Sequence, residues 1–243
     1  MVRSNAVLLA FGCLTALSVQ GLAGARGVVP ASPTEHLALE RLLVDIEKAP
    51  VAYRGHRRLE ASSAKLKESA WLEADTAFDP AFGFKYSVIA EGGSERILRR
   101  VLKAVLEAER ENSTREEWRK RSLSRANYEF DFGGRAGDGM LKVELTPRRR
   151  DSRLVLGSAL LTATSGDLVR VEGRLSKSPS FWVRWVDVSR SYSPMGGSMM
   201  PVAVESTADV RIAGLSTFAM TYVYQMVGGR PVDATPSTTL AGR

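Results

Sequence analysis

The stretch DLVRVEGRLSKSPSFWVRWVD, residues 167–187, decides the fold that this sequence predicts. Two runs rich in β-branched and aromatic residues, 168–175 and 180–188, flank the segment Ser-Lys-Ser-Pro at 176–179, which is typical of a turn between antiparallel strands. The second run carries bulky apolar side chains on both faces. A strand of this kind must be covered on both sides or line a cavity.

Strand-like patterns continue on both sides of this stretch. Upstream, alternation with a period of two runs from residue 51 to about 91 and again from 127 to 164. Downstream, two further runs cover 200–212 and 216–226. Because no helix separates neighbouring strands within these regions, the pattern favours antiparallel hairpins over βαβ units.

Three helices are predicted within this β-rich chain. The first opens at 32–35, where Ser and Glu supply cap chemistry and Pro falls in the first turn. The second, 94–112, has apolar residues at helical spacing opposite a charged side, and the third begins at Thr114, with Glu117 completing a capping box. We expect these helices to lie against one face of a curved sheet, which gives an α+β fold that is mostly β.

The first 25 residues have the layout of a secretory signal peptide. Arg3 precedes an apolar run at 6–17, and the small residues Ala23, Gly24 and Ala25 follow. A single membrane anchor is the alternative, but the run falls short of the roughly 20 residues that a spanning helix needs. We therefore predict an exported, periplasmic protein cleaved after about Ala25.

Cleavage of the predicted signal peptide would leave a mature chain of one domain that contains no cysteine. The only Cys of the chain lies inside the predicted signal peptide, so the mature chain has no disulfide, thiolate metal site or Cys nucleophile. We expect a single domain at 26–230, followed by a polar, Pro-containing tail at 231–243 that is loose.

The chain is basic, with 34 Lys and Arg against 27 Asp and Glu. Short basic clusters fall at 99–100 and 148–150. They are either ordinary solvated surface or sites of attraction to the anionic headgroups of a membrane surface. Nucleic acid is not an expected partner, because exposed aromatic residues are not interleaved with the basic ones.

Several longer pieces resemble a known group of proteins. The run GDLVRVEGRLSKSPSFWVRWVDVSRSY and the later GGSMMPVAVESTADVRIAGLSTFAMTYVY are similar to the later sheet of the LolA-like outer-membrane lipoprotein carriers. FKYSVIAEGGSERILRRVLKAVLEAERE and LTPRRRDSRLVLG resemble an uncharacterised branch of that superfamily. The resemblance implies a curved, half-open antiparallel β-barrel whose helices cover the concave face, and an apolar cavity for acyl chains.

One departure from the carriers concerns the region 61–78. It lacks the Pro-Gly-Phe-Arg-Trp-like signature that the early strand of true lipoprotein carriers usually shows. The resemblance therefore leaves open a related role in lipid binding or in sensing envelope stress.

The residues also favour a cavity independently of the resemblance. A concave face rich in aromatic residues and Met forms a water-poor pocket, and Met adapts to flexible chains. The alternative is an ordinary filled core under the helices. The candidates for lining a lipid site are Trp182, Trp185, Phe218, Met220, Tyr222 and Tyr224.

Enzyme signatures are weak. The chain has two His residues, His36 in the first helix and His56 in a predicted turn, with no H-E-x-x-H motif and no partner at metal-ligand spacing. The segment 214–218, Gly-Leu-Ser-Thr-Phe, lacks the last Gly of a nucleophile elbow. We therefore predict a protein that is not an enzyme and has no metal or cofactor.

Two functions are compatible with these features. The first is a periplasmic carrier that binds a lipid, or the acyl chains of a lipoprotein, in a half-barrel. The second is an envelope sensor or adaptor that uses the same fold to bind another envelope protein.

Overall fold

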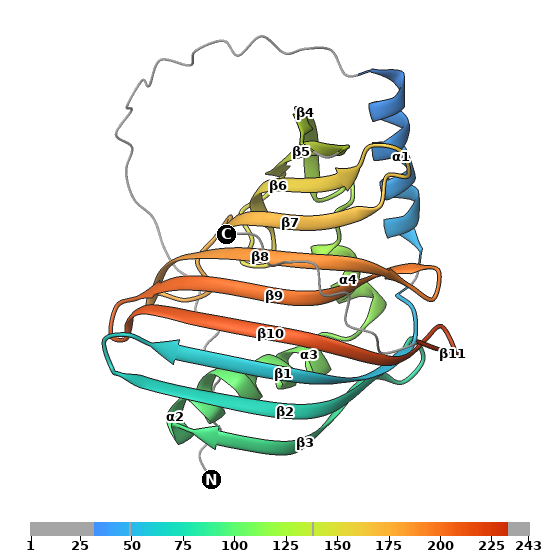
Figure 1. Ribbon diagram of the computed structural model, residues 1–243. Coiled ribbons are helices and arrows are strands. Elements are labelled where there is room, and N and C mark those ends of the chain that lie inside the picture. Colours follow the sequence, from blue (N-terminus) through green and yellow to red (C-terminus); the bar gives the residue numbers. More distant parts are fainter. Residues whose placement is uncertain (1–31, 49, 138, 233–243) are drawn as a thin grey trace, which may run out of the picture.

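The computed structural model describes residues 32–48, 50–137 and 139–232. The predicted signal peptide lies outside the described residues, as does the tail from 233 onward. The strands form one antiparallel sheet in the order β3-β2-β1-β10-β9-β8-β7-β6-β5-β4, with β11 added to β10 (Figure 1). Since β3 and β4 are edges of this order, the sheet is open and not a closed barrel.

Ten long strands build the sheet, and each pairs with its neighbours in antiparallel register. Their bounds, with the short β11, are β1 Tyr53–Ser63, β2 Glu68–Asp79, β3 Gly83–Gly93, β4 Tyr128–Ala136, β5 Met140–Pro147, β6 Val155–Thr162, β7 Leu168–Leu175, β8 Val183–Met195, β9 Ser198–Val210, β10 Gly214–Val227 and β11 Arg230–Pro231.

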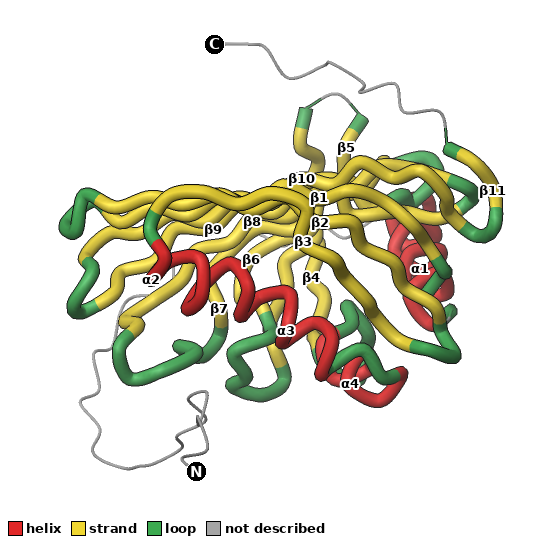
Figure 2. The backbone as a smooth tube through the Cα atoms, turned by 90° about the horizontal axis from the view of Figure 1, so that it is seen from below, coloured by secondary structure: helices red, strands yellow, loops and turns green. Residues whose placement is uncertain are grey.

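The helices lie on one side of the curved sheet (Figure 2). They are α1 Pro33–Glu47, the continuous run α2 Glu95–Ile97, η1 Leu98–Leu102 and α3 Lys103–Glu111, and the short α4 Arg115–Arg121. The predicted fold is therefore confirmed: an α+β, mostly β, half-open barrel with helices over its concave face.

The predicted helix starts are confirmed in detail. Ser32 accepts a hydrogen bond from the Glu35 backbone N–H, while the Glu35 carboxylate accepts one from the Ser32 N–H at 2.7 Å. Thr114 caps α4 by accepting from the Glu117 N–H at 3.3 Å, the backbone half of the expected box. These local contacts satisfy N–H groups that have no partner within the helix.

The long helix differs from the prediction by containing a π-helical segment, η1. Leu98, Leu102 and Leu106 recur at every fourth residue, and all three are buried. In a regular α-helix of 3.6 residues per turn, residues at this spacing drift around the axis. The wider π turn offsets the drift, so the three leucines stay directed at the sheet.

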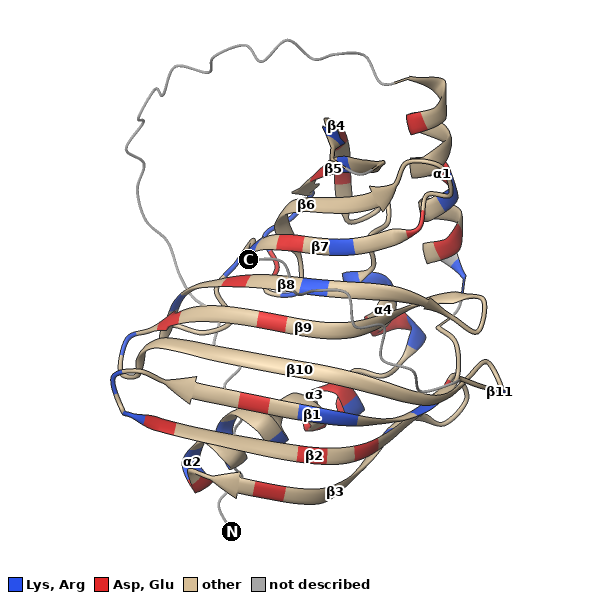
Figure 3. Cartoon of the chain, viewed as in Figure 1, with Lys and Arg blue, Asp and Glu red and all other residues tan. Residues whose placement is uncertain are grey.

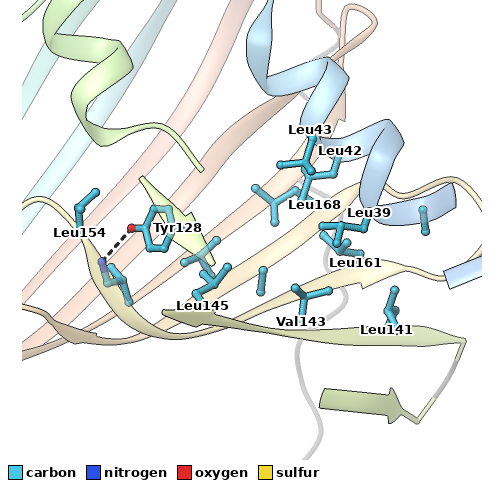
Figure 4. Packing of buried hydrophobic residues seen from close by; sticks show 14 of the residues in the cluster. Leu39, Leu42, Leu43, Tyr128, Leu141, Val143, Leu145, Leu154, Leu161 and Leu168 are labelled. Carbon is cyan, nitrogen blue, oxygen red and sulfur yellow. Dashed lines mark hydrogen bonds between the residues drawn. The ribbon is translucent and has the colours of Figure 1, made fainter. Parts of the chain in front are cut away.

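Two main groups of buried side chains fill the concave face. One lies between α1 and strands β4–β7, where Leu39, Leu42 and Leu43 meet Leu161 and Leu168 (Figure 4). The other lies between η1–α3 and strands β1–β3 and β10, where Leu102 and Leu106 pack near Leu59, Leu72 and Met220. A helix therefore closes each end of the concave face separately.

The central hairpin differs from the predicted one in its bounds. Strand β8 begins at Val183, three residues later than expected, and continues to Met195. The connection from β7 spans 176–182, so Phe181 and Trp182 belong to a loop. Ser180 accepts a backbone hydrogen bond from the Val183 N–H at 3.1 Å, which closes a turn at this point.

Candidate functional site: a pocket on the concave face

A pocket of about 620 Å³ lies on the concave face between helix α1 and helices α3 and α4. Its volume is within the range of about 300–1,000 Å³ that is usual for ligand pockets. The walls come from both helical regions and from the middle strands. They include Leu42 and Ile46 of α1, Tyr53 and Arg57 of β1, Glu109 of α3, Trp118 and Arg121 of α4, Val171 of β7, Arg190 and Tyr192 of β8, Met199 and Met200 of β9, and Tyr222 and Tyr224 of β10.

Strand register explains why apolar and aromatic side chains gather here. Successive strands place one residue each in a row across the concave face, since side chains of one parity share a face. Strand β10 contributes no charged residue to the sheet (Figure 3). One such row contains Leu72, Leu59, Met220, Val204, Arg190, Val171, Ala159 and Val143.

A buried arginine forms one wall of the pocket. Arg57 is 2% exposed, and its two terminal nitrogens donate to the Glu109 carboxylate at 2.6 and 3.0 Å. It also donates to the Tyr53 hydroxyl, and its guanidinium carbon lies 4.5 Å from the centre of the Tyr222 ring. The Arg57 Nε is buried with no partner among the described atoms. This cluster fastens α3 to the sheet beside the pocket.

Burial controls the ionisation of these groups. Desolvation lowers the pKa of Arg57, but the hydrogen bonds and charge of Glu109 outweigh it, so the pKa lies above its ordinary value. Desolvation raises the pKa of Tyr222 to about 12, although the charge of Arg57 acts against the change. Arg57 is therefore charged and Tyr222 neutral at physiological pH.

Two further arginines in the pocket lack partners. Among the residues that the structure describes, the side chain of neither Arg121 nor Arg190 has a hydrogen bond or an ion pair within the protein. Both are half-buried. Burial lowers the pKa of Arg121; the charge of Glu109 opposes this shift, and that of Arg190 adds to it.

Four of the six residues that the sequence suggested as cavity lining lie on β10 and face the concave side. Tyr222 and Tyr224 line the pocket, and the Tyr224 hydroxyl donates to the Pro201 carbonyl at 2.8 Å. Met220 is buried in the core under η1–α3, and Phe218 packs against that core. These two lie beside the pocket and are not part of its walls.

The two tryptophans lie elsewhere. Trp185 is three residues before the buried Val188, so it faces the opposite side of the sheet, where it stacks on Arg174 at 4.8 Å. Trp182 is 49% exposed in the β7–β8 loop and contacts Phe181 edge to face. Neither residue lines the concave-face pocket.

Sequence reasoning missed the arginines of the pocket, although a signal was present. Arg57 follows Gly55 and precedes Leu59 at alternate positions of β1, and all three are buried. Arg190 is likewise in phase with Val188 and Tyr192 on β8. A charged residue that falls in phase with an apolar face indicates a buried ion pair or a ligand contact.

The described part of the chain offers few residues for catalysis or metal binding. His36 is exposed on α1, and the half-exposed His56 lies 3.5 Å from Asp75. No group of three or more His, Cys, Asp and Glu that could hold a metal is found among the described residues. Within the same residues, no helix combines the length and the apolar character needed to cross a membrane.

Among the comparisons with known proteins, the one with solved structures finds similar chains. No protein-family model matches this chain, and no curated protein matches it in sequence. A LolA superfamily protein from Nitrosomonas europaea is similar at 9% identity and a TM-score of 0.42. The similarity covers 79% of this chain and 92% of that one.

Two further structures are similar over the same shares of the chains, 79% and 92%. A DUF1329 family protein from Desulfovibrio piger has 7% identity and a TM-score of 0.37. An outer membrane lipoprotein-sorting protein domain from Vibrio parahaemolyticus has 10% identity and a TM-score of 0.34. Two of these descriptions, the LolA superfamily protein and the lipoprotein-sorting protein domain, name the group that the sequence resembles, at 9% and 10% identity.

Proposed function

We propose that this protein is an exported, periplasmic, non-enzymatic carrier that binds a lipid, or the acyl chains of a lipoprotein, in the concave-face pocket. One observation carries the proposal: the pocket of about 620 Å³ combines Met199, Met200 and aromatic side chains between two separate helical covers. Thioether and aromatic walls suit flexible hydrocarbon chains. Each buried CH₂ group contributes roughly 0.8 kcal/mol, so even a modest pocket favours acyl binding.

The arrangement of the covers supports loading of a chain. Helix α1 contributes Leu42 and Ile46 to the pocket, whereas α3 and α4 contribute Glu109 and Trp118. Helix α1 precedes β1 and α4 lies between α3 and β4, and neither is part of a strand pair, so the wall between them could widen without breaking the pairing of the sheet. A ligand would enter between these helices.

The first experiment is native mass spectrometry of the protein purified from the exported fraction, followed by organic extraction. Stoichiometric lipid or acylated cargo supports the carrier. A folded protein that is empty and takes up no fluorescent fatty-acyl probe contradicts it. A stable protein partner bound to such an empty chain would instead support the sensor or adaptor.

A matched pair of variants on α1 tests the location of the ligand. Ile46→Trp enlarges a partly buried side chain that lines the pocket, so it should reduce uptake of the acyl probe by about tenfold or more. Leu37→Trp on the same helix enlarges a side chain that is 55% exposed, and it should leave uptake unchanged. Equal uptake by both variants would place the ligand outside this pocket.

A further inference from the structure

The charges in the walls of the concave-face pocket do not balance. The walls carry five basic side chains, Lys48, Arg57, Arg121, Arg153 and Arg190, and three acidic ones, Asp45, Glu109 and Asp167. The ion pairs are Lys48 with Asp45, Arg57 with Glu109, and Arg153 with Asp151 and Glu117. Arg121 and Arg190 have no such partner among the described residues, and neither has Asp167, so two positive charges and one negative charge in the walls stand outside ion pairs.

Arg190 has no side-chain acceptor directly beside it in the sheet. Its register partners are Val171 on β7 and Val204 on β9, which offer no side-chain acceptor. Arg121 is the last residue of α4, on the helical side of the pocket. Both side chains line the same pocket; burial lowers the pKa of Arg121, and the charge of Arg190 adds to this shift. Two like charges in a half-buried site oppose each other unless an anion joins them.

We propose that the pocket binds an acidic lipid, whose oxyanion head, a carboxylate or a phosphate, is held between Arg121 and Arg190. This inference rests on the proposed function and names the class of its ligand. The hydrocarbon chain then lies against the apolar walls, including Ile46 and Met200. A planar guanidinium group matches the geometry of carboxylate and phosphate oxygens and forms the stronger, charge-assisted type of hydrogen bond.

Three amphiphiles with the same chain test the proposal: hexadecanoate, hexadecyl phosphate and hexadecanol, titrated against delipidated protein. The wild type should bind at least one of the two acids about tenfold or more tightly than the alcohol. Comparison of the affinities for hexadecanoate and hexadecyl phosphate shows whether the site prefers a carboxylate or a phosphate head group. Binding of all three with equal affinity would overturn the oxyanion site and leave the carrier function standing. Binding of none would contradict both.

Variants assign the preference to the two arginines. Arg121→Met and Arg190→Met keep an unbranched, flexible side chain and remove its charge, so each should weaken binding of the acid by about tenfold and change binding of hexadecanol by less than about threefold. Arg99→Met on η1, whose side chain is 70% exposed, is the control and should bind all three as the wild type does. Unchanged acid binding in both pocket variants would overturn the assignment.

The thermal midpoint of the unliganded variants provides a second readout. Removing one of two like charges relieves repulsion, so Arg190→Met should unfold at a temperature no lower than the wild type when no lipid is bound. Added hexadecanoate should raise the midpoint of the wild type more than that of the variant. A variant that is less stable without lipid would show that Arg190 has a structural role, which contradicts the proposal.

A different region carries a second inference. At one end of the sheet, three loops lie side by side: 64–67 between β1 and β2, 176–182 between β7 and β8, and 211–213 between β9 and β10 (Figure 1). The Arg211 N–H donates to the Trp182 carbonyl at 2.8 Å, and the Ala64 N–H donates to the Leu215 carbonyl at 3.1 Å. These hydrogen bonds join the loops into one surface, which we call the loop end.

The loop end is both apolar and basic. Phe181 is 72% exposed, and Trp182, Ile212 and Leu215 are each about half exposed. The bases of the three loops are Lys65, Lys67, Lys177 and Arg211; the loops contain no acidic residue, and none of these bases has an ion-pair partner among the described residues. The basic turn at 148–150, which the sequence suggested for membrane attraction, differs from the loop end in having ion pairs. Arg148 pairs with Glu129, and Arg149 pairs with Asp151.

We infer that the loop end docks on an anionic lipid surface. Exposed Trp and Phe side chains insert into the interface between headgroups and hydrocarbon, and unpaired Lys and Arg side chains are attracted to acidic headgroups. The charge complementarity favours a membrane over a protein partner, because each of the three loops contributes at least one base without an ion-pair partner among the described residues, although Arg211 also donates to the Phe181 carbonyl at 2.9 Å. Binding at this end leaves the helical side of the sheet free.

Co-sedimentation with vesicles tests this surface. Vesicles of mixed phosphatidylglycerol and phosphatidylcholine should bind the wild type about tenfold more tightly than vesicles of phosphatidylcholine alone, and added salt should weaken that binding. Phe181→Ser with Trp182→Ser should reduce binding by about tenfold or more. The control removes two other exposed apolar side chains, by Leu156→Ser with Val223→Ser, and should have no effect. Equal losses in both double variants, or no binding to either vesicle, would overturn the inference.

Discussion

The buried contacts of helix α1 with the sheet are apolar, whereas α3 meets the sheet through a buried ion pair as well. Under α1, the described core contacts are apolar, such as Leu39 and Leu43 against Leu161 and Leu168. Under α3, Arg57 and Glu109 join the helix to β1 within a core that is otherwise apolar. The pocket lies where these two arrangements meet.

This difference determines how each cover can be loosened. An apolar contact weakens in proportion to the side-chain volume that is removed. A buried ion pair loses its whole stabilising effect when one partner is removed, because the other charge is then left without solvation. We therefore expect α3 to be sensitive to single charge changes and α1 to be sensitive to cavities.

The largest effect is expected at Glu109. Glu109→Ala leaves Arg57, which is 2% exposed, without its carboxylate, so the free energy of unfolding should fall by about 3–5 kcal/mol. Glu111→Ala changes an exposed residue at the end of the same helix and should cost less than about 0.5 kcal/mol. Urea denaturation measures both. A cost at Glu109 as small as that at Glu111 would show that the pair does not fasten α3.

A somewhat smaller effect is expected in the core under α1. Leu161→Ala removes a side chain that is fully buried between α1 and β6, and it should cost about 3 kcal/mol through the cavity that it leaves. Leu156→Ala on the same strand is the control, since Leu156 is 53% exposed. Denaturation at low and high salt should give the same difference between the two variants, because no charge is involved. A salt-dependent difference would contradict the apolar account of this region.

The smallest effect is expected in the stability of the protein at acidic pH, through Asp151. The hydrogen bond from Arg153, which also joins Glu117 of α4, lowers the pKa of Asp151 from 3.8 to about 2. A carboxyl whose pKa is lowered by folding stabilises the fold above its unfolded pKa, and this stability is lost as the pH falls from about 4 to about 2. Solvent screening reduces the contribution to about 1 kcal/mol.

Thermal unfolding of Asp151→Asn and of the wild type at several pH values tests whether the contribution of Asp151 to stability is lost as the pH falls. The variant should be less stable at pH 6, and the difference should close by about pH 2. Asp131→Asn on β4 serves as the control, because Asp131 is exposed and has no ion-pair partner among the described residues. A difference that grows as the pH falls would contradict the assignment.

Much of the fold was predictable because its signals are local. Cap residues such as Ser32 and Thr114 act on N–H groups three positions away, and the alternation along β10 assigns Tyr222 and Tyr224 to one face whatever the neighbouring strands are. The half-open barrel and the side of the sheet that the helices cover were expected from the same patterns and from the LolA-like resemblance.

The placement of the two tryptophans could not be predicted, because the local pattern allows either face of the strand. Trp182 and Trp185 stand in a run that is apolar at nearly every position, so the alternation could not decide their faces. The turn at Ser180 shortened β8 and left Trp182 in the loop, while the register of β8 turned Trp185 toward Arg174. One shift of register exchanges the two faces of a strand.

The sequence by itself determined the class of fold, the helix starts and the face of β10, because each depends on residues within one turn or one strand. Only the tertiary structure decided that Arg57 meets Glu109, 52 residues away, and that Arg121 and Arg190 share a pocket. Pairing of charges depends on distances between elements that the chain order does not encode. The sheet and α4 bring two arginines into one pocket with no ion-pair partner among the described residues, and the proposed anion site rests on this placement, which the sequence does not reveal.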